Sequence, residues 1–452
     1  MLLSNNDILK RFFSIFAIVS CLISCVDADP EDIGRNEELI IPAEKYEVIS
    51  DDIYEFREYI DGLLNQEDSF IDFSTYGNLI SAQLDMCLQK LNTKYGLTDE
   101  VIGFRRVTYL YESMDQYGNK AELSSLAYWL GYFDDGEWYD LSPDNICLME
   151  HYTITSVDEC PTNSIVLEPF VLGNTLVIMP DYIGYGVTAD MVHPYLNHGL
   201  CALNSIDALT AGFTAFRDIS ESDLAEGWQL EVMGASQGGG NALAVHKYMD
   251  THKDFAQTWH FSGSYCAAGP YDPCLTVDKY FEAGVTDSPV LFVLTIKAMY
   301  DSYPEILGRF DKDSMYSDKF LGIRDSIEGM VDSKEYSTSM INFKIISKLS
   351  PGNVEIALSD ILSTEMLDKD SDICMAFYEC LGKNDLTSGW EPINPIRLYY
   401  SEADKTVPCD NAIAVLDAFG DDRVTLEKGP SFRHSISCAM WMLKLLGESY
   451  AD

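Results

Sequence analysis

A serine flanked by glycines is the feature of this 452-residue chain with the clearest chemical use. Gly234, Ser236 and Gly238 form the pattern G-x-S-x-G, and two further glycines, Gly239 and Gly240, follow it. A serine on a sharp turn between a strand and a helix has a strained backbone, so its neighbours must lack bulk. Such a turn exposes the hydroxyl group for attack on an electrophilic carbon. We therefore predict that Ser236 is a nucleophile.

The residue after this serine has a predicted role of its own. Residues 228–233 alternate as a buried strand does, and residues 241–248 are predicted to form a helix, so Gln237 stands at a helix N-terminus. Backbone N–H groups at that position lack intrahelical acceptors and attract negative charge. We expect the N–H of Gln237 to stabilise an oxyanion formed beside Ser236. A chance match is the alternative, and the flanking strand and the glycine run argue against it.

A nucleophilic serine needs a base, and of the seven histidines only His434 lies in the C-terminal third of the chain. It stands in a Gly/Pro loop between a predicted strand at 423–427 and a predicted helix at 436–446. Loops at the carboxyl ends of strands carry the chemistry in open α/β sheets. We predict that His434 is the base; an ordinary histidine at a helix start is the alternative.

The base in turn needs an acid that orients its ring. A predicted strand begins at Ile396, and Asp404 follows just past its end. Glu402 is the second candidate for this acid. The alternative for Asp404 is a structural role as a turn-forming aspartate. Four further aspartates are expected on the next helix or turn in contact with water, and these are Asp410, Asp417, Asp421 and Asp422.

Four segments together resemble the α/β-hydrolase superfamily, and within it the bacterial secretory-lipase-like esterases. The similarity extends over about residues 100–450. The segments are D-Y-I-G-Y-G at 181–186, G-A-S-Q-G at 234–238, S-E-A-D-K-T-V-P at 401–408 and F-R-H-S at 432–435.

This resemblance implies a role for each matching residue: Ser236 as nucleophile, His434 as base and Asp404 as orienting acid. It also implies an oxyanion hole built from the backbone of Gln237 and of a residue after the third strand. The family usually reads H-G-[TS] or H-G-G there, whereas this chain has Tyr152 in place of the glycine. Tyr152 is therefore the candidate for the second donor, with a side chain that crowds the loop.

Composition limits the classes of function. The chain has 30 Lys and Arg against 73 Asp and Glu, a formal net charge of −43, which repels phosphate backbones and excludes nucleic acid as a partner. Its length allows one large α/β core with an insertion, or two modest domains. No His/Cys spacing typical of a zinc site is present, so no structural zinc is expected. A reaction at Ser236, His434 and Asp404 needs no metal and no organic cofactor, so none is predicted.

The N-terminus has the pattern of an export signal. Lys10 and Arg11 precede an apolar run at 12–23 that is too short for a stable span. The segment Leu22-Ile-Ser-Cys25 resembles the lipobox of bacterial lipoproteins, and Cys21 is a weaker alternative. We therefore expect a lipid anchor at Cys25 and a location in the bacterial cell envelope, at the outer membrane on its periplasmic or surface face. A plain secretory signal is the alternative.

Ten cysteines remain beyond this signal, and an exported location permits disulfides. Cys409 follows Asp404 by five residues and Cys438 follows His434 by four. Because the acid and base loops must meet, we predict a disulfide between Cys409 and Cys438 that ties them together. Free thiols are the alternative. Three further pairs are open, and these are Cys147–Cys160, Cys266–Cys274 and Cys374–Cys380.

The predicted fold is an α/β-hydrolase fold, with a mostly parallel central sheet flanked by helices and a mainly helical cap inserted after the sixth strand. The predicted domains are a signal peptide at 1–24, an acidic tether at 25–50, a core at 51–269 and 395–452, and a cap at 270–394. Predicted strands lie at 105–112, 123–132, 146–151, 175–180, 230–234 and 258–262, and predicted helices at 51–64, 76–95, 198–218, 289–300, 340–349 and 354–362.

The predicted activity is hydrolysis of carboxylic esters through an acyl-enzyme on Ser236. The expected partners are a small-molecule, lipid or glycan ester and, through the anchor, a membrane. A prolyl-type serine peptidase shares the order of the three residues, but it normally carries a propeller domain, and no blade-like repeat is present. From another class, a surface lipoprotein that binds glycan or lipid without catalysis is also open.

Overall fold

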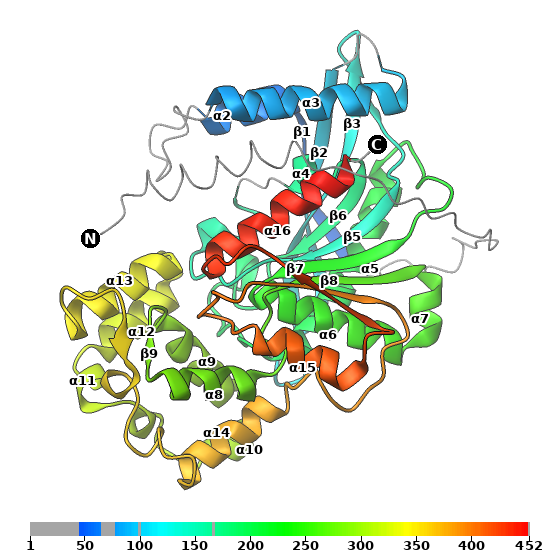
Figure 1. The fold of residues 1–452 in the computed structure, drawn as a ribbon. Coiled ribbons are helices and arrows are strands. Elements are labelled where there is room, and N and C mark those ends of the chain that lie inside the picture. The colour runs from blue at the N-terminus through cyan, green and yellow to red at the C-terminus, as the bar shows by residue number, and fades with distance from the viewer. Residues whose placement is uncertain (1–44, 65–76, 98–100, 165–167, 451–452) are drawn as a thin grey trace.

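The computed structural model describes residues 45–64, 77–97, 101–164 and 168–450. Its centre is one large twisted sheet with helices on both faces (Figure 1). The strands of this sheet are β1 (Tyr46–Glu55), β2 (Val101–Met114), β3 (Lys120–Asp134), β4 (Glu137–Asp140), β5 (Asn145–Glu150), β6 (Thr175–Pro180), β7 (Leu230–Ala235), β8 (Phe261–Ala267), β11 (Ile396–Tyr400) and β12 (Val424–Lys428).

The strands follow the order β1-β2-β3-β6-β5-β7-β8-β11-β12, and β4 pairs with β3. The pairings β1–β2, β2–β3 and β3–β6 are antiparallel. From β6 to β12 all neighbouring strands are parallel. The central parallel strands are short apolar runs because both of their faces are buried. With β1 and β4 set aside, β8 is the sixth strand along the chain, and the helical insertion follows it as predicted.

Helices cover the two faces of the sheet. The helices that flank it are α2 (Phe56–Leu64), α3 (Gly77–Tyr95), α4 (Glu168–Val171), α5 (His198–Ile219), α6 (Gln237–Thr251), α7 (Lys253–Thr258), α15 (Asp410–Phe419) and α16 (His434–Ser449). Apolar residues of α5, α6, α7 and α15 share one buried cluster with the sheet. Residues of α2, α3 and α16 share a second cluster on the other face. The helices α15 and α16 therefore pack on opposite faces, as Figure 1 also shows.

The segment between β8 and β11 is mainly helical and has its own apolar cluster, which includes Val293, Ile341 and Phe377. Its elements are α8 (Pro273–Ala283), β9 (Val285–Thr286), α9 (Val290–Ser302), α10 (Pro304–Leu307), α11 (Asp318–Leu321), α12 (Arg324–Ser333), α13 (Thr338–Leu349), β10 (Ile356–Ala357) and α14 (Asp372–Gly382). We call this segment the cap. Its predicted boundaries at 270–394, like the other domain boundaries, stay a prediction.

Three predicted elements need correction. Residues 51–55 belong to strand β1 rather than to a helix, and β1 begins at Tyr46, inside the predicted tether. This edge strand is mostly exposed and acidic, so it lacks the apolar alternation that marks a strand. Strand β8 begins at Phe261, three residues late, because α7 continues to Thr258. Residues 354–362 contain β10 and a 3-10 turn instead of a helix.

The N-terminal predictions concern a part of the chain that the structure does not describe. The signal peptide at 1–24, Cys21 and Cys25 all lie outside the described residues. Within the described ranges, no helix is both long and apolar enough to cross a bilayer.

Candidate functional site

The turn around Ser236 has the geometry that the glycine pattern predicts. Ser236 follows β7 directly and precedes α6, with φ 59° and ψ −124°. Its N–H donates to the carbonyl of Ala267 at 2.8 Å. A Cβ added to Gly238 would lie 2.0 Å from the carbonyl oxygen of Glu150, so no larger residue fits there. The strain at Ser236 is held in place by these close contacts.

The three residues predicted to cooperate are joined by hydrogen bonds. Nε2 of His434 lies 2.7 Å from Oγ of Ser236, and Nδ1 of His434 lies 2.6 Å from Oδ2 of Asp404. The carboxylate accepts the Nδ1 proton, which leaves Nε2 free to accept the proton of the serine hydroxyl. Ser236 is 9% exposed and Asp404 is 7% exposed. The arrangement can therefore withdraw a proton from Ser236 in a setting largely shielded from water.

The structure distinguishes between the two candidate acids. The second oxygen of Asp404, Oδ1, accepts the backbone N–H groups of Thr406 and Val407, each at 2.9 Å. These bonds hold the carboxylate toward the imidazole. Glu402 instead is exposed and forms an ion pair with Lys428 at 2.7 Å. Of these two candidate acids, Asp404 is the one that bonds to His434.

The predicted disulfide between Cys409 and Cys438 is wrong: both are free, as are all ten cysteines within the described ranges. The prediction assumed that the two helices start side by side, whereas α15 and α16 pack on opposite faces of the sheet. Cys438 packs with the α16 cluster, and burial raises the pKa of its thiol to about 12.

A serine joins the acid and base loops in place of that disulfide. The hydroxyl of Ser401 donates to the carbonyl of Phe432 at 2.7 Å and accepts the N–H of the same residue at 3.0 Å. Ser401 directly follows β11, the strand that leads to Asp404, and Phe432 lies two residues before His434. This paired contact keeps the two loops in register.

The Ser236 hydroxyl lies at a cavity of about 1620 Å³ between the carboxyl ends of the strands and the cap. Its walls include apolar cap residues, among them Leu291, Phe292, Phe343 and Ile346. Phe343 is 74% exposed. The site thus combines the serine with a large space that is bordered by apolar side chains.

Both predicted oxyanion donors border this cavity. Gln237 is the first residue of α6, so its N–H has no intrahelical acceptor. Tyr152 lies in the loop after β5 with 57% of its surface exposed. Its carbonyl accepts a hydrogen bond from Nδ1 of the neighbouring His151 at 2.7 Å. This bond fixes the direction of the peptide group between Tyr152 and Thr153.

The loop after β5 is also bonded to the cap. The hydroxyl of Thr155 donates to the carbonyl of Tyr336 at 2.7 Å, and the N–H of Val157 donates to the carbonyl of Lys334 at 2.8 Å. The ammonium group of Lys334 lies over the ring of Tyr185 at 4.5 Å. Burial lowers the pKa of Lys334 to about 8. The position of the cap is therefore tied to the loop that borders the serine.

Sequence reasoning missed two buried groups next to the serine turn. Glu150 ends β5 beneath Gly238, and burial raises the pKa of its carboxyl to about 7. His193 contacts the side chain of Gln237 through a bond of 2.7 Å between their Nε2 atoms. The signal for His193 was its position a few residues after the D-Y-I-G-Y-G segment; Glu150 had no local signal.

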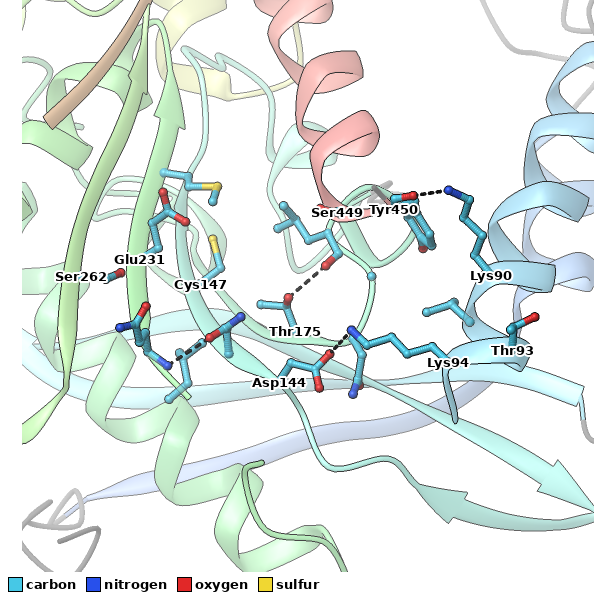
Figure 2. A pocket seen from close by; sticks show the side chains of 18 of the residues that line it. Lys90, Thr93, Lys94, Asp144, Cys147, Thr175, Glu231, Ser262, Ser449 and Tyr450 are labelled. Atoms are coloured by element: carbon cyan, nitrogen blue, oxygen red, sulfur yellow. Dashed lines mark hydrogen bonds and ion pairs between the residues drawn. The ribbon is translucent and has the colours of Figure 1, made fainter. Parts of the chain in front are cut away.

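A second cavity of about 840 Å³ lies at the amino ends of the central parallel strands β5, β6 and β7, beneath α3 (Figure 2). Figure 2 shows Lys94 paired with Asp144 and Lys90 reaching the carbonyl of Tyr450 at its rim. Its lining contains no histidine, so it lacks a base of the kind found beside Ser236. Among the residues that the structure describes, no group of three or more His, Cys, Asp or Glu could hold a metal ion.

Comparison with solved structures identifies the architecture. No family model and no curated protein matches the sequence. The rice cell wall degrading esterase LipA from Xanthomonas oryzae superposes with a TM-score of 0.60 at 19% identity, over 80% of this chain and 92% of the other. A putative hydrolase from Legionella pneumophila gives 0.62 at 16% identity, over 81% and 94%. The chain has the α/β-hydrolase fold.

A more distant example of the fold is lipase A from Candida antarctica, with a TM-score of 0.50 at 10% identity over 77% of this chain and 79% of that one. In an α/β-hydrolase fold the nucleophile stands on the turn between a central strand and the following helix, the position of Ser236 between β7 and α6. At identities this low, the superpositions establish the fold alone. The reaction has to be argued from the site.

Proposed function

We propose that the protein is a serine hydrolase that cleaves carboxylic esters. The observation that carries this proposal is the unbroken chain of hydrogen bonds from Ser236 through His434 to Asp404 at the wall of the large cavity. The fold shared with an esterase and a lipase supports it. The likeness to these two structures would not by itself support the proposed activity, because one fold can host many reactions.

Each residue has a defined step in the proposed reaction. Oγ of Ser236 attacks the acyl carbonyl while Nε2 of His434 accepts its proton, and Asp404 stabilises the imidazolium that forms. The N–H of Gln237 and a donor from the loop at Tyr152 stabilise the tetrahedral oxyanion. The alcohol leaves with the proton from His434, and a water molecule then releases the acid from Ser236 by the same steps. No step requires a metal or an organic cofactor.

The cavity favours a bulky substrate with an apolar part. Its volume of about 1620 Å³ exceeds the roughly 300–1,000 Å³ of ordinary small-molecule sites. Apolar side chains of the cap, including Phe292 and Ile346, border it. A small-molecule, lipid or glycan ester with an apolar acyl or aryl group is the proposed substrate class.

A fluorophosphonate probe and p-nitrophenyl esters of rising chain length test this proposal together. We expect the wild-type protein to be labelled and to hydrolyse the esters. Ser236→Ala should lose labelling, and Ser236→Ala and His434→Ala should each lower kcat by about 10⁴-fold or more without unfolding. Folded wild-type protein that is neither labelled nor active would favour the non-catalytic binding protein. Faster cleavage of prolyl peptides than of esters would favour the peptidase.

We also propose that the protein is anchored in the bacterial cell envelope by lipid on Cys25. The support is the short apolar segment at 12–23 and the Leu22-Ile-Ser24 segment directly before this cysteine. Metabolic labelling with a palmitate analogue should mark the wild-type protein and Cys21→Ala but not Cys25→Ala. Labelling that persists in Cys25→Ala and vanishes in Cys21→Ala would move the anchor, and labelling of neither wild type nor variants would leave a plain secretory signal.

A further inference from the structure

We propose that His193 is a positioning residue of the oxyanion hole: it holds the side chain of Gln237 and thereby directs the backbone N–H of Gln237 at the reacting carbonyl. This inference rests on the proposed function, because it assigns a role within the same reaction. His193 does not itself touch the Ser–His–Asp chain in this assignment, and acts only through Gln237.

The contact between His193 and Gln237 pairs a donor with an acceptor in only one protonation state of the imidazole. Nδ1 of His193 lies 2.8 Å from the carbonyl of Ile183, an acceptor, so Nδ1 carries the proton and Nε2 carries the lone pair. The amide nitrogen of Gln237 lies 2.7 Å from Nε2 and donates to it. Burial lowers the pKa of His193 to about 3, which keeps the ring neutral. In a charged ring Nε2 would also carry a proton, so two donors, Nε2 of His193 and the amide nitrogen of Gln237, would face each other.

The first turn of α6 needs such an anchor. Gln237 has no intrahelical partner for its N–H, and it follows a serine at φ 59°, from which the backbone would relax if it were free. The bond from Ser236 to Ala267 holds one side of the turn, and the contact of Gly238 with Glu150 holds the other. Between them, the buried side chain of Gln237, 1% exposed, is held by His193.

His193 in turn is held by the D-Y-I-G-Y-G segment. Gly184 has φ +86°, and a Cβ added there would lie 2.5 Å from Cα of His193, so the two backbones are in direct contact. The ring of Tyr185 has its centroid 4.9 Å from that of His193. His193 is only 4% exposed. Its ring is therefore a fixed point, suited to orient a neighbour.

The same segment also reaches the other border of the oxyanion hole. The hydroxyl of Tyr182 donates to the carbonyl of His151 at 3.1 Å, and the two rings stack with centroids 3.9 Å apart. His151 precedes Tyr152, the candidate second donor. One rigid loop thus contacts the backbone on one side of the hole and, through His193, Gln237 on the other. This gives the D-Y-I-G-Y-G segment a physical role.

The test compares variants that break or keep the bond. His193→Leu and Gln237→Met each remove it from one side, and Gln237→Met keeps the backbone N–H; His193→Gln keeps an acceptor close to the position of Nε2. We expect the first two to lower kcat by roughly 10- to 100-fold, less than the loss of a whole oxyanion donor, with little change in KM. His193→Gln should recover most of the loss, and the double variant should be no slower than either single variant.

A transition-state analogue separates positioning from simple loss of structure. A boronic acid that adds to Ser236 places an oxygen in the oxyanion hole, so its inhibition constant should rise in the variants by the same factor as kcat/KM falls. Activities are scaled to the fraction of Ser236 labelled by fluorophosphonate, which removes unfolded protein from the comparison. If His193→Leu does not fold, Gln237→Met carries the test, because it breaks the same bond.

His198→Gln is the matched control. His198 is also buried and neutral, with Nδ1 donating to the carbonyl of Asn384 at 2.8 Å, and it borders α6 near Gly240 without contacting Gln237. Its kcat should stay at the wild-type level even if its melting temperature falls. Wild-type kcat and analogue affinity in Gln237→Met and folded His193→Leu, or equal losses in His198→Gln, would overturn the inference alone. An unlabelled wild-type protein would overturn the proposed function instead.

Discussion

Asp404 and His434, 30 residues apart in the chain, meet through a hydrogen bond of 2.6 Å between Oδ2 and Nδ1. The other carboxylate oxygen is occupied by the backbone N–H groups of Thr406 and Val407. The carboxylate therefore cannot turn away from the ring without losing two further bonds. This arrangement keeps the Nδ1 proton on the side of Asp404 and the lone pair on the side of Ser236.

Asp404→Asn should lower kcat by about 10⁴-fold, because an amide NH₂ facing Nδ1 favours the wrong tautomer of His434. The matched control is Glu402→Gln, two residues earlier, which should keep wild-type turnover because Glu402 contacts Lys428 rather than His434. Steady-state hydrolysis of a p-nitrophenyl ester measures both. Equal losses in the two variants would show that the acid has been assigned to the wrong carboxylate.

Gly238→Ala should displace the serine turn, since the added Cβ would lie 2.0 Å from the carbonyl oxygen of Glu150. Overpacking of this kind costs about 1–3 kcal/mol. We expect fluorophosphonate labelling to slow strongly and the free energy of unfolding to fall. Gly199→Ala is the control, because nothing lies within 4 Å of its added Cβ. Wild-type labelling in Gly238→Ala would contradict the close packing of the turn.

Ser401→Ala should loosen the base loop, because it removes both hydrogen bonds to Phe432 and leaves a partly buried carbonyl unpaired. The expected loss of stability is about 1–3 kcal/mol. We also expect a lower kcat, since the position of His434 is no longer set by the acid loop. Urea unfolding and ester turnover provide the two measurements, and a variant that keeps wild-type values in both would show that this link is dispensable.

The thiols of Cys409 and Cys438 should react with an alkylating reagent after unfolding in urea without reductant, because neither is in a disulfide. Mass spectrometry of the digested protein would show both modified peptides. The melting temperature should likewise be the same with and without dithiothreitol. A peptide pair joined through these two cysteines would overturn the assignment of α15 and α16 to opposite faces.

Stability should depend on pH through Glu150. Burial raises the pKa of its carboxyl from 4.5 to about 7 in the folded protein, so folding favours the protonated form. This contribution is complete below pH 4.5 and is lost as the pH rises through 7; its size is about 3 kcal/mol. Glu150→Gln stays neutral and should unfold less readily than wild type above pH 7. Unfolding curves between pH 4 and 8 test this, and parallel pH dependences for the two proteins would contradict it.

Much of the candidate site could be predicted from the sequence because each part has a local signal. The glycines around Ser236 reflect a backbone that rejects side chains, whatever the rest of the chain does. Asp404 and His434 each follow a short strand, and the carboxyl ends of parallel strands meet at one edge of the sheet. Short apolar runs predicted the central strands, and the point where strands and helices stop alternating predicted the position of the helical insertion.

Other features were decided only by the tertiary structure. The separation of Cys409 from Cys438 depends on which face of the sheet each helix covers, and spacing along the chain does not encode that. The strand β1 is polar, and it becomes a strand only because β2 offers it an edge. Glu150 carries no local signal, and the pKa shifts of both Glu150 and His193 follow from burial, which the neighbouring residues in the sequence do not reveal. The backbone conformation of a turn restricts which residues fit in and beside it, so the local sequence reveals it. The burial of a side chain and its partners are defined only after the sheet and the helices have packed together.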